Sequence, residues 1–132
     1  VVGKGGKTRP YHKKKPDQSV VSYRSFINGM VICHQSMIVR RDKVVDFANE
    51  KYKIACDIDW AIRTAKNCKT FLDTGIYISK FLDGGVSQNN RLDAVRERFR
   101  ICVHHFGWSK TIIQQFIIGF HYIINNFKKD IP

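Results

Sequence analysis

Residues 52–63 read Tyr-Lys-Ile-Ala-Cys-Asp-Ile-Asp-Trp-Ala-Ile-Arg, and their apolar side chains recur at helical spacing. The apolar positions that share one helix face are Ile58, Ala61, Ile62 and Ala65. The carboxylate of Asp57 can accept hydrogen bonds from the exposed amides of a first helical turn, and Asp59 lies favourably in the field of the helix dipole. The pattern therefore predicts a helix from Asp57 to about Asn67 that buries its apolar stripe.

The segments on either side of this helix are rich in strand-forming residues. Upstream, the apolar run from Ser25 to Val39 predicts a loop that enters a short buried strand at Gln35–Arg40. A short helix is expected to follow at 41–49. Downstream, residues 69–81 combine Phe, Thr, Ile and Tyr with one glycine, which is typical of an extended chain with a bulge.

Two amphipathic helices are predicted near the C-terminus. The first runs from a cap at Asn90 to about His105 and ends at Gly107, and the second follows a cap at Ser109. The residues expected to face inward on the first helix are Leu92, Val95, Phe99 and Phe106. The last helix has a wide stripe of Ile and Phe, but its Gln, His and Asn side chains would be costly in hydrocarbon. It is therefore expected to lie on a protein core or a membrane surface rather than to cross a bilayer.

The composition describes one basic domain with a core. The chain has 132 residues, 43% of them hydrophobic, and a formal net charge of +12, which excludes a mostly disordered protein. The charge favours anionic partners such as phosphates, nucleotides, nucleic acid or an acidic membrane surface. A nucleic-acid-binding module would interleave exposed aromatic and basic residues, whereas here the aromatic residues fall on the apolar stripes. The four cysteines are widely spaced, which favours buried reduced thiols over a zinc site.

The first candidate site is the motif Asp57-x-Asp59-Trp60-x-x-Arg63. Two carboxylates near a helix start can bind a divalent ion, or one can act as a base while the other orients a group. Arg63 could pair with Asp59 or contact an anionic substrate. The structural alternative is a helix cap, an acid near the dipole and a surface ion pair, and the spacing alone favours this alternative.

Two other polar clusters interrupt the pattern. Cys33-His34-Gln35-Ser36 lies within an apolar run, so it either lines a site or contains an internally hydrogen-bonded histidine. If it lines a site, His34 should lie within about 10 Å of Asp57 in one cleft. Asp83-Gly84-Gly85-Val86-Ser87 could present backbone amides to a phosphate, although a plain turn is the more common use of such residues.

The order of these motifs resembles the C-terminal half of the family 2 inverting glycosyltransferases, which have the GT-A fold. The match runs from Gly29 to Phe99 and is most similar to bacterial enzymes that build surface polysaccharides. The resemblance implies an α/β fold, or α+β for this part alone, with short strands followed by a C-terminal helical hairpin. It also implies a variable basic loop or hairpin at 1–24, an acceptor-side catalytic part at 25–88 and amphipathic helices at 89–132.

The resemblance implies an enzyme that transfers a sugar, with inversion, from a nucleotide-sugar donor to a saccharide or lipid-linked acceptor. Asp57 would be the general base. The substrate-binding residues would be His34, Gln35, Asp59, Trp60, Arg63, Gly84, Gly85 and Ser87. The donor and a divalent cation, Mg²⁺ or Mn²⁺, would bind mainly in an N-terminal half that this chain lacks, so the chain alone is expected to be inactive.

The same resemblance implies a cytoplasmic location, with peripheral contact at the inner face of the membrane and no nucleic-acid partner. The alternative is a basic module without catalytic activity that binds nucleic acid or a membrane surface. Exposed aromatic residues among the basic ones would favour the nucleic-acid form of this alternative.

Overall fold

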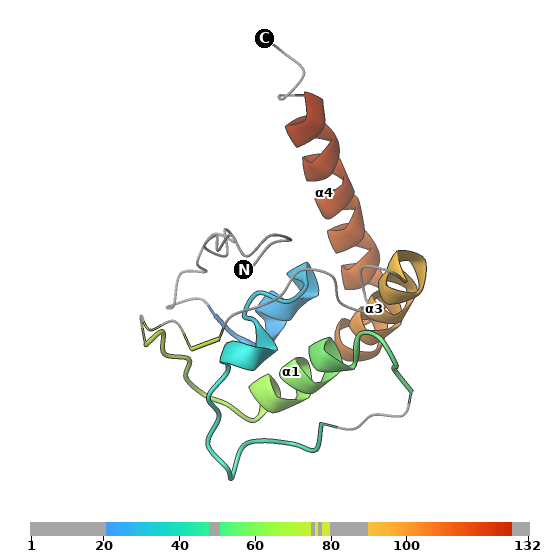
Figure 1. The fold of residues 1–132 in the computed structure, drawn as a ribbon. Helices are drawn as coiled ribbons and strands as arrows, with labels where there is room; N and C mark the ends of the chain where they lie inside the picture. The colour runs from blue at the N-terminus through green and yellow to red at the C-terminus, as the bar shows by residue number, and fades with distance from the viewer. Residues whose placement is uncertain (1–20, 48–50, 75, 77, 80–89, 128–132) are drawn as a thin grey trace.

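The computed structural model describes residues 21–47, 51–74, 76, 78–79 and 90–127, and every regular element in these ranges is helical. The elements are the 3-10 turns η2 (Tyr23–Asn28) and η3 (His34–Ser36) and the α-helices α1 (Cys56–Lys66), α3 (Arg91–Phe106) and α4 (Trp108–Phe127). Figure 1 shows α1 and α3 close together, while the end of α4 projects well beyond them. The core therefore lies among η2, α1 and α3.

The core is small and made of apolar side chains from three elements. Its fully buried members are Phe26 of η2, Ala61, Ile62 and Ala65 of α1, and Ile101 and Cys102 of α3. The predicted stripe of α1 is thus confirmed at its centre, and Ile58 packs partly buried against the same cluster. Small residues on α1 allow the neighbouring elements to approach closely, because alanine adds little volume at the contact.

Helix α1 begins one residue earlier than the sequence pattern predicts, and its N-cap position is Ala55. Asp57 therefore lies inside the first turn, where its Oδ1 accepts a hydrogen bond from the amide of Ile58 at 2.9 Å. The expected capping role belongs instead to a side chain from another helix. The carboxylate of Glu97 on α3 accepts from the amides of Lys53, Ile54 and Ala55 at 3.0, 2.8 and 2.9 Å.

Glu97 thus links the start of α1 to the middle of α3. Its carboxylate accepts from three backbone amides at the start of α1 that would otherwise need water. Burial acts to raise the pKa of the Glu97 carboxyl, but the bonds from Ala55, Lys53 and Ile54 outweigh it and hold that pKa below its ordinary value. The carboxylate form is therefore the one that the fold stabilises.

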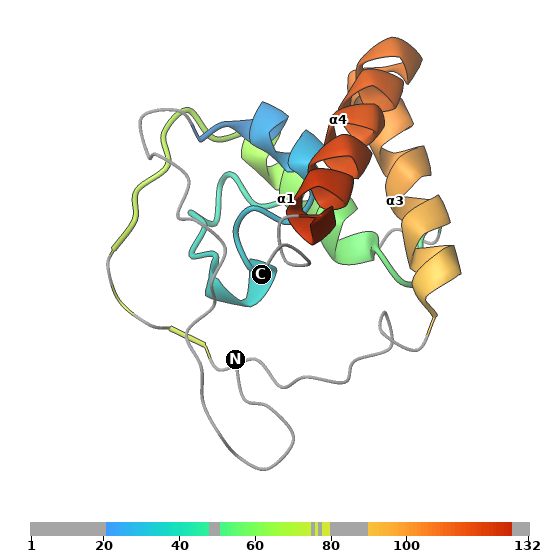
Figure 2. The same cartoon turned by 90° about the horizontal axis from the view of Figure 1, so that it is seen from above.

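Helices α3 and α4 meet at Gly107, whose φ of 86° lies in the left-handed region that favours glycine. Helix α4 starts directly at Trp108, ahead of the cap expected at Ser109. The hydroxyl of Thr111, which is fully buried, donates to the carbonyl of Gly107 at 2.8 Å. The predicted helical pair about Gly107 is confirmed, and Figure 2 shows α4 lying beside α3.

Within the described residues, none of the helices is long and apolar enough to cross a bilayer.

The expected α/β fold is wrong for the part of the chain that the structure describes. Neither Gln35–Arg40 nor the described residues of 69–81 form a strand. Residues 34–36 form η3, and the chain after it is extended but unpaired. An extended segment becomes a strand only when its amides and carbonyls bond to a neighbouring strand, and no such ladder forms among the described residues. β-branched composition alone could not reveal that missing partner.

The helix expected at 41–49 is also absent from the described residues, 41–47. Carbonyls there serve as acceptors for side chains of α1 rather than for amides one turn ahead. The indole of Trp60 donates to the carbonyl of Val45 at 2.9 Å, and the guanidinium of Arg63 donates to that of Asp46 at 3.0 Å. These bonds hold the segment against α1 in a non-helical conformation.

The inward face predicted for α3 is wrong at two positions. Leu92 and Val95 are 76% and 64% exposed, whereas Ile101 and Cys102 are fully buried. The polar contacts explain the difference, because Glu97 must reach the amides before α1 and His105 must reach a buried carboxylate on α1. These bonds fix the rotation of α3 about its axis and leave part of its apolar stripe outside.

We predict that Glu97→Ala lowers the free energy of unfolding by about 2 kcal/mol near neutral pH, because three amides lose a charged acceptor. The folded pKa lies below the ordinary one, so the contribution is complete above the ordinary glutamate range and disappears as the pH falls through the folded value. Urea unfolding at several pH values measures both effects.

The matched control is Asp93→Ala, one turn away on α3, which removes an exposed carboxylate that contacts Arg96 at 3.3 Å. An exposed pair of this kind contributes about 0.5 kcal/mol or less. Equal losses in the two variants would contradict the capping role of Glu97.

Candidate active site

The side chains of His34 and Asp57 are in contact between η3 and the first turn of α1. The imidazole Nδ1 lies 3.2 Å from the carboxylate Oδ2, and the two side chains are 28% and 29% exposed. The distance expected from the sequence, within about 10 Å, is therefore met. The shared cleft that was expected with it stays a prediction, because the hollow found in the described part of the chain is lined by residues of α3 and α4. The pair joins segments 23 positions apart and keeps both functional groups within reach of solvent.

An aromatic pair lies next to this contact. The ring of Phe47, which is 48% exposed, is 6.4 Å from the imidazole of His34 and 5.6 Å from the indole of Trp60. Trp60 is anchored by its bond to the carbonyl of Val45. Ser36, in the same turn as His34, is bonded through its hydroxyl to that of Ser79 at 2.6 Å. The surface around Asp57 thus combines a carboxylate, an imidazole and an exposed aromatic face.

Asp59 has a different environment from Asp57. Its side chain is 1% exposed, and its two oxygens bond to Nε of Arg63 at 2.7 Å and to Nε2 of His105 at 2.8 Å. Residues two apart on a helix point in different directions, so one carboxylate faces η3 while the other faces α3. The expected pairing of Arg63 with Asp59 is found.

His105 was not predicted as part of any site. Its side chain is 4% exposed, and Nδ1 lies 2.9 Å from Nζ of Lys66 while Nε2 contacts Asp59. Burial lowers the pKa of His105 and outweighs the bond to Asp59, which raises it, while the charge of Lys66 lowers it further. The contacts fit a neutral imidazole that donates from Nε2 and accepts from the Lys66 ammonium at Nδ1. Nothing in the spacing of α3 distinguishes His105 from an ordinary helix residue.

The remaining predicted site residues are less informative. Gln35 is exposed on η3. Gly84, Gly85 and Ser87 lie outside the described residues, as does the basic arm at 1–20.

The Asp57-Ile58-Asp59 tripeptide does not fit a metal site. Its carboxylates engage different partners, His34 for one and Arg63 with His105 for the other. A divalent cation needs oxygens that converge on one point. The described residues also contain no group of three or more His, Cys, Asp or Glu side chains arranged to hold a metal.

Comparison with known proteins finds no matching family model, no similar curated protein and no similar solved structure. The residues and their geometry therefore carry the functional argument.

We predict that His105 makes stability fall at mildly acidic pH. Because its folded pKa is lowered, the unfolded chain binds a proton more readily than the folded one. The free energy of unfolding should therefore decrease as the pH drops below about 6.5, the ordinary histidine value, until the folded pKa is passed. Denaturant unfolding of the chain and of His105→Gln measures the difference.

In His105→Gln the amide can still donate to Asp59, but it does not titrate, so this part of the pH dependence should vanish. His104→Gln is the matched control, because His104 is exposed next to His105. Loss of the pH dependence in the control rather than in His105→Gln would refute the assignment.

Proposed function

We propose that this chain supplies the general base and acceptor-side surface of an inverting glycosyltransferase, with Asp57 as the base. The observation that carries the proposal is the half-exposed carboxylate of Asp57 at a helix start, held 3.2 Å from His34 beside the exposed ring of Phe47. The order of the motifs, which resembles that of the family 2 enzymes, supports the same assignment, although the strands that this resemblance implies do not form among the described residues.

The reaction needs one base on the acceptor side. The acceptor hydroxyl oxygen attacks the anomeric carbon of the donor and forms the new carbon–oxygen bond. The bond from that carbon to the diphosphate breaks on the opposite face, and the nucleoside diphosphate leaves with its electron pair. Asp57 takes the hydroxyl proton as the oxygen attacks, so the anomeric configuration inverts.

The surroundings of Asp57 suit this role. The amide of Ile58 bonds Oδ1 and the imidazole of His34 contacts Oδ2, so the carboxylate is held in one orientation. His34 is a positioning residue in this proposal. Asp59 cannot replace Asp57, because its side chain is 1% exposed and is closed to a substrate hydroxyl, whereas that of Asp57 is 29% exposed.

The aromatic pair supplies a surface for the acceptor. Phe47 is exposed and braced by Trp60 at 5.6 Å. Binding sites for small molecules combine such apolar faces with a few placed polar groups. The proposed substrate class is a saccharide whose ring lies against Phe47 with one hydroxyl directed at Asp57.

We predict that Asp57→Asn lowers kcat by about 10²–10⁴-fold and leaves donor binding nearly unchanged, since the amide keeps the shape but cannot accept the proton. Turnover is measured in a protein that contains this chain and a donor-binding half of the family type. Formation of the inverted product is followed with a nucleotide-sugar donor and a saccharide acceptor.

Asp42→Asn is the matched control, because Asp42 is an exposed aspartate that contacts Arg40 and Lys43. It should retain full turnover. His34→Gln should lower kcat less than Asp57→Asn and should alter the pH profile, which a purely structural residue would not do. An Asp57→Asn variant with most of its turnover would remove Asp57 from the mechanism.

A further inference from the structure

Helices α3 and α4 share an exposed apolar surface. Its residues, named here the α3–α4 apolar face, are Leu92, Val95 and Phe99 of α3 and Trp108, Ile112, Ile113, Phe116, Ile117 and Phe120 of α4. Phe116 is 75% exposed, and Trp108 and Phe120 are each 64% exposed. Single exposed apolar residues are ordinary, but a contiguous group on two helices marks an interaction surface.

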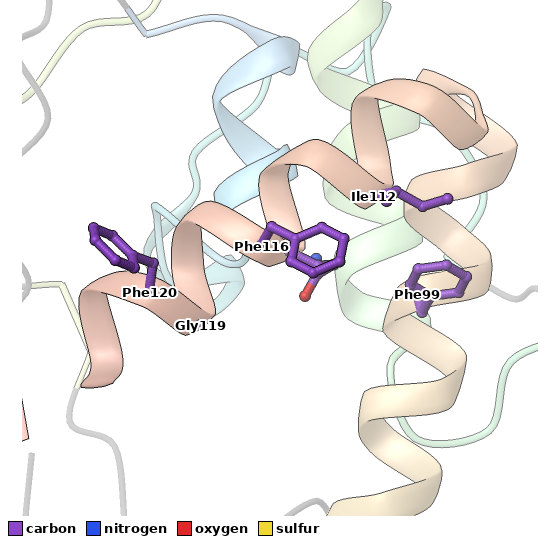
Figure 3. A pocket seen from close by; sticks show the side chains of 6 residues that line it. Phe99, Ile112, Phe116, Gly119 and Phe120 are labelled. Atoms are coloured by element: carbon purple, nitrogen blue, oxygen red, sulfur yellow. The ribbon is translucent and has the colours of Figure 1, made fainter. Parts of the chain in front are cut away.

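The face is continuous across the two helices. The rings of Phe99 and Trp108 meet edge to face at 5.7 Å. Phe99 also lines a shallow hollow of about 500 Å³ with Ile112, Phe116 and other residues of α4. Figure 3 shows Phe99 on α3 near Ile112 and Phe116 on α4, with Phe120 farther along the same helix.

The orientation of α4 accounts for the exposure. Thr111 is fully buried, and Gln114, Gln115 and Ile118 are half-buried. The largest apolar side chains lie on the opposite side of the helix, as the helical spacing of 100° per residue requires. The polar side thus faces the body of the protein, and the far end of α4 projects past the other helices (Figure 1).

Basic side chains flank this face. Arg91 lies four residues before Val95 and Arg96 four residues after Leu92, so each lies about 40° around α3 from the edge of the apolar stripe, on opposite sides. Arg100 lies farther round on the same side as Arg96. All three arginines are exposed, as is Lys110 in the first turn of α4. Arg96 contacts Asp93 at 3.3 Å, and the sequence of α4 contains no acidic residue.

We propose that the α3–α4 apolar face docks on the surface of an anionic lipid bilayer. Phe and Trp side chains would enter the headgroup boundary, and the flanking arginines and Lys110 would contact lipid phosphates. The helices lie along the surface, because no described helix is long and apolar enough to cross it. This proposal stands independently of the proposed transfer reaction.

Charge decides against a second copy of the chain as the occupant. A two-fold interface brings the same patch of each subunit together, so the basic residues of one copy would face those of the other. Each chain carries a net charge of +12, so two copies repel each other. An anionic surface attracts the same charge. The same argument makes the docking sensitive to salt.

Vesicle co-sedimentation of the whole chain tests the proposal. The chain should bind vesicles of phosphatidylcholine with 30% phosphatidylglycerol more strongly than phosphatidylcholine alone, and several-fold more weakly in about 0.5 M than in about 0.05 M salt. Phe116→Ser combined with Phe120→Ser should lower the partition coefficient about tenfold or more, since two exposed rings no longer insert.

The matched control is Ile38→Ser combined with Leu72→Ser, which removes two apolar side chains that are 79% and 85% exposed and lie outside α3 and α4. It should bind vesicles as the parent chain does. The emission of Trp108 should shift to the blue on binding, and this shift should be lost in Trp108→Phe.

Three results would overturn the proposal. If binding is sensitive to salt but the two Phe substitutions leave the partition coefficient unchanged, the chain is attracted by its net charge alone. Equal binding to vesicles with and without phosphatidylglycerol, or no binding to either, would show that the face does not dock on an anionic bilayer. A dimer in sedimentation velocity that the Phe substitutions dissociate, without vesicle binding, would assign the face to a second copy.

Discussion

The buried carboxylate of Asp59 constrains much of this structure. A charge that is 1% exposed is tolerated only when its oxygens are bonded, and here the partners come from two helices. Arg63 belongs to the same helix, but His105 must be brought from α3. This requirement, together with the bond from Glu97 to the amides before α1, fixes how α3 is rotated against α1. The apolar stripe of α3 cannot then face the core along its whole length.

The same constraint separates the two acids of Asp57-Ile58-Asp59. Because Asp59 points to α3, the helical angle between positions two apart directs Asp57 toward η3 and His34. One acid is used to hold the fold and the other remains accessible to a substrate. The proposed base and the α3–α4 apolar face are thus both consequences of where Asp59 lies, one through α1 and the other through α3.

Patterns in the sequence predicted the helices and turns whose formation depends on residues close together in the chain. Helix α1 was found from its apolar spacing, the pair of helices about Gly107 from the glycine, and the nearness of His34 to Asp57 from a polar cluster in an apolar run. The strands were wrong, because strand pairing depends on a distant partner that composition does not reveal. The inward orientation predicted for Leu92 and Val95 is wrong, because the rotation of α3 depends on bonds to residues some forty positions away. The role of His105 could not be predicted, because its partner Asp59 lies far away in the sequence.

The central claim is that Asp59 and His105 couple α1 to α3, while the partly exposed contact of Asp57 with His34 orients the carboxylate but contributes less to stability. A double-mutant cycle on the free energy of unfolding tests it most directly, with Asp59→Asn and His105→Gln in one cycle and Asp57→Asn and His34→Gln in the other. The account predicts a coupling energy of about 2 kcal/mol or more for the buried pair and less than about 1 kcal/mol for the half-exposed pair. A coupling near zero between Asp59 and His105, or a larger one between Asp57 and His34, would contradict it.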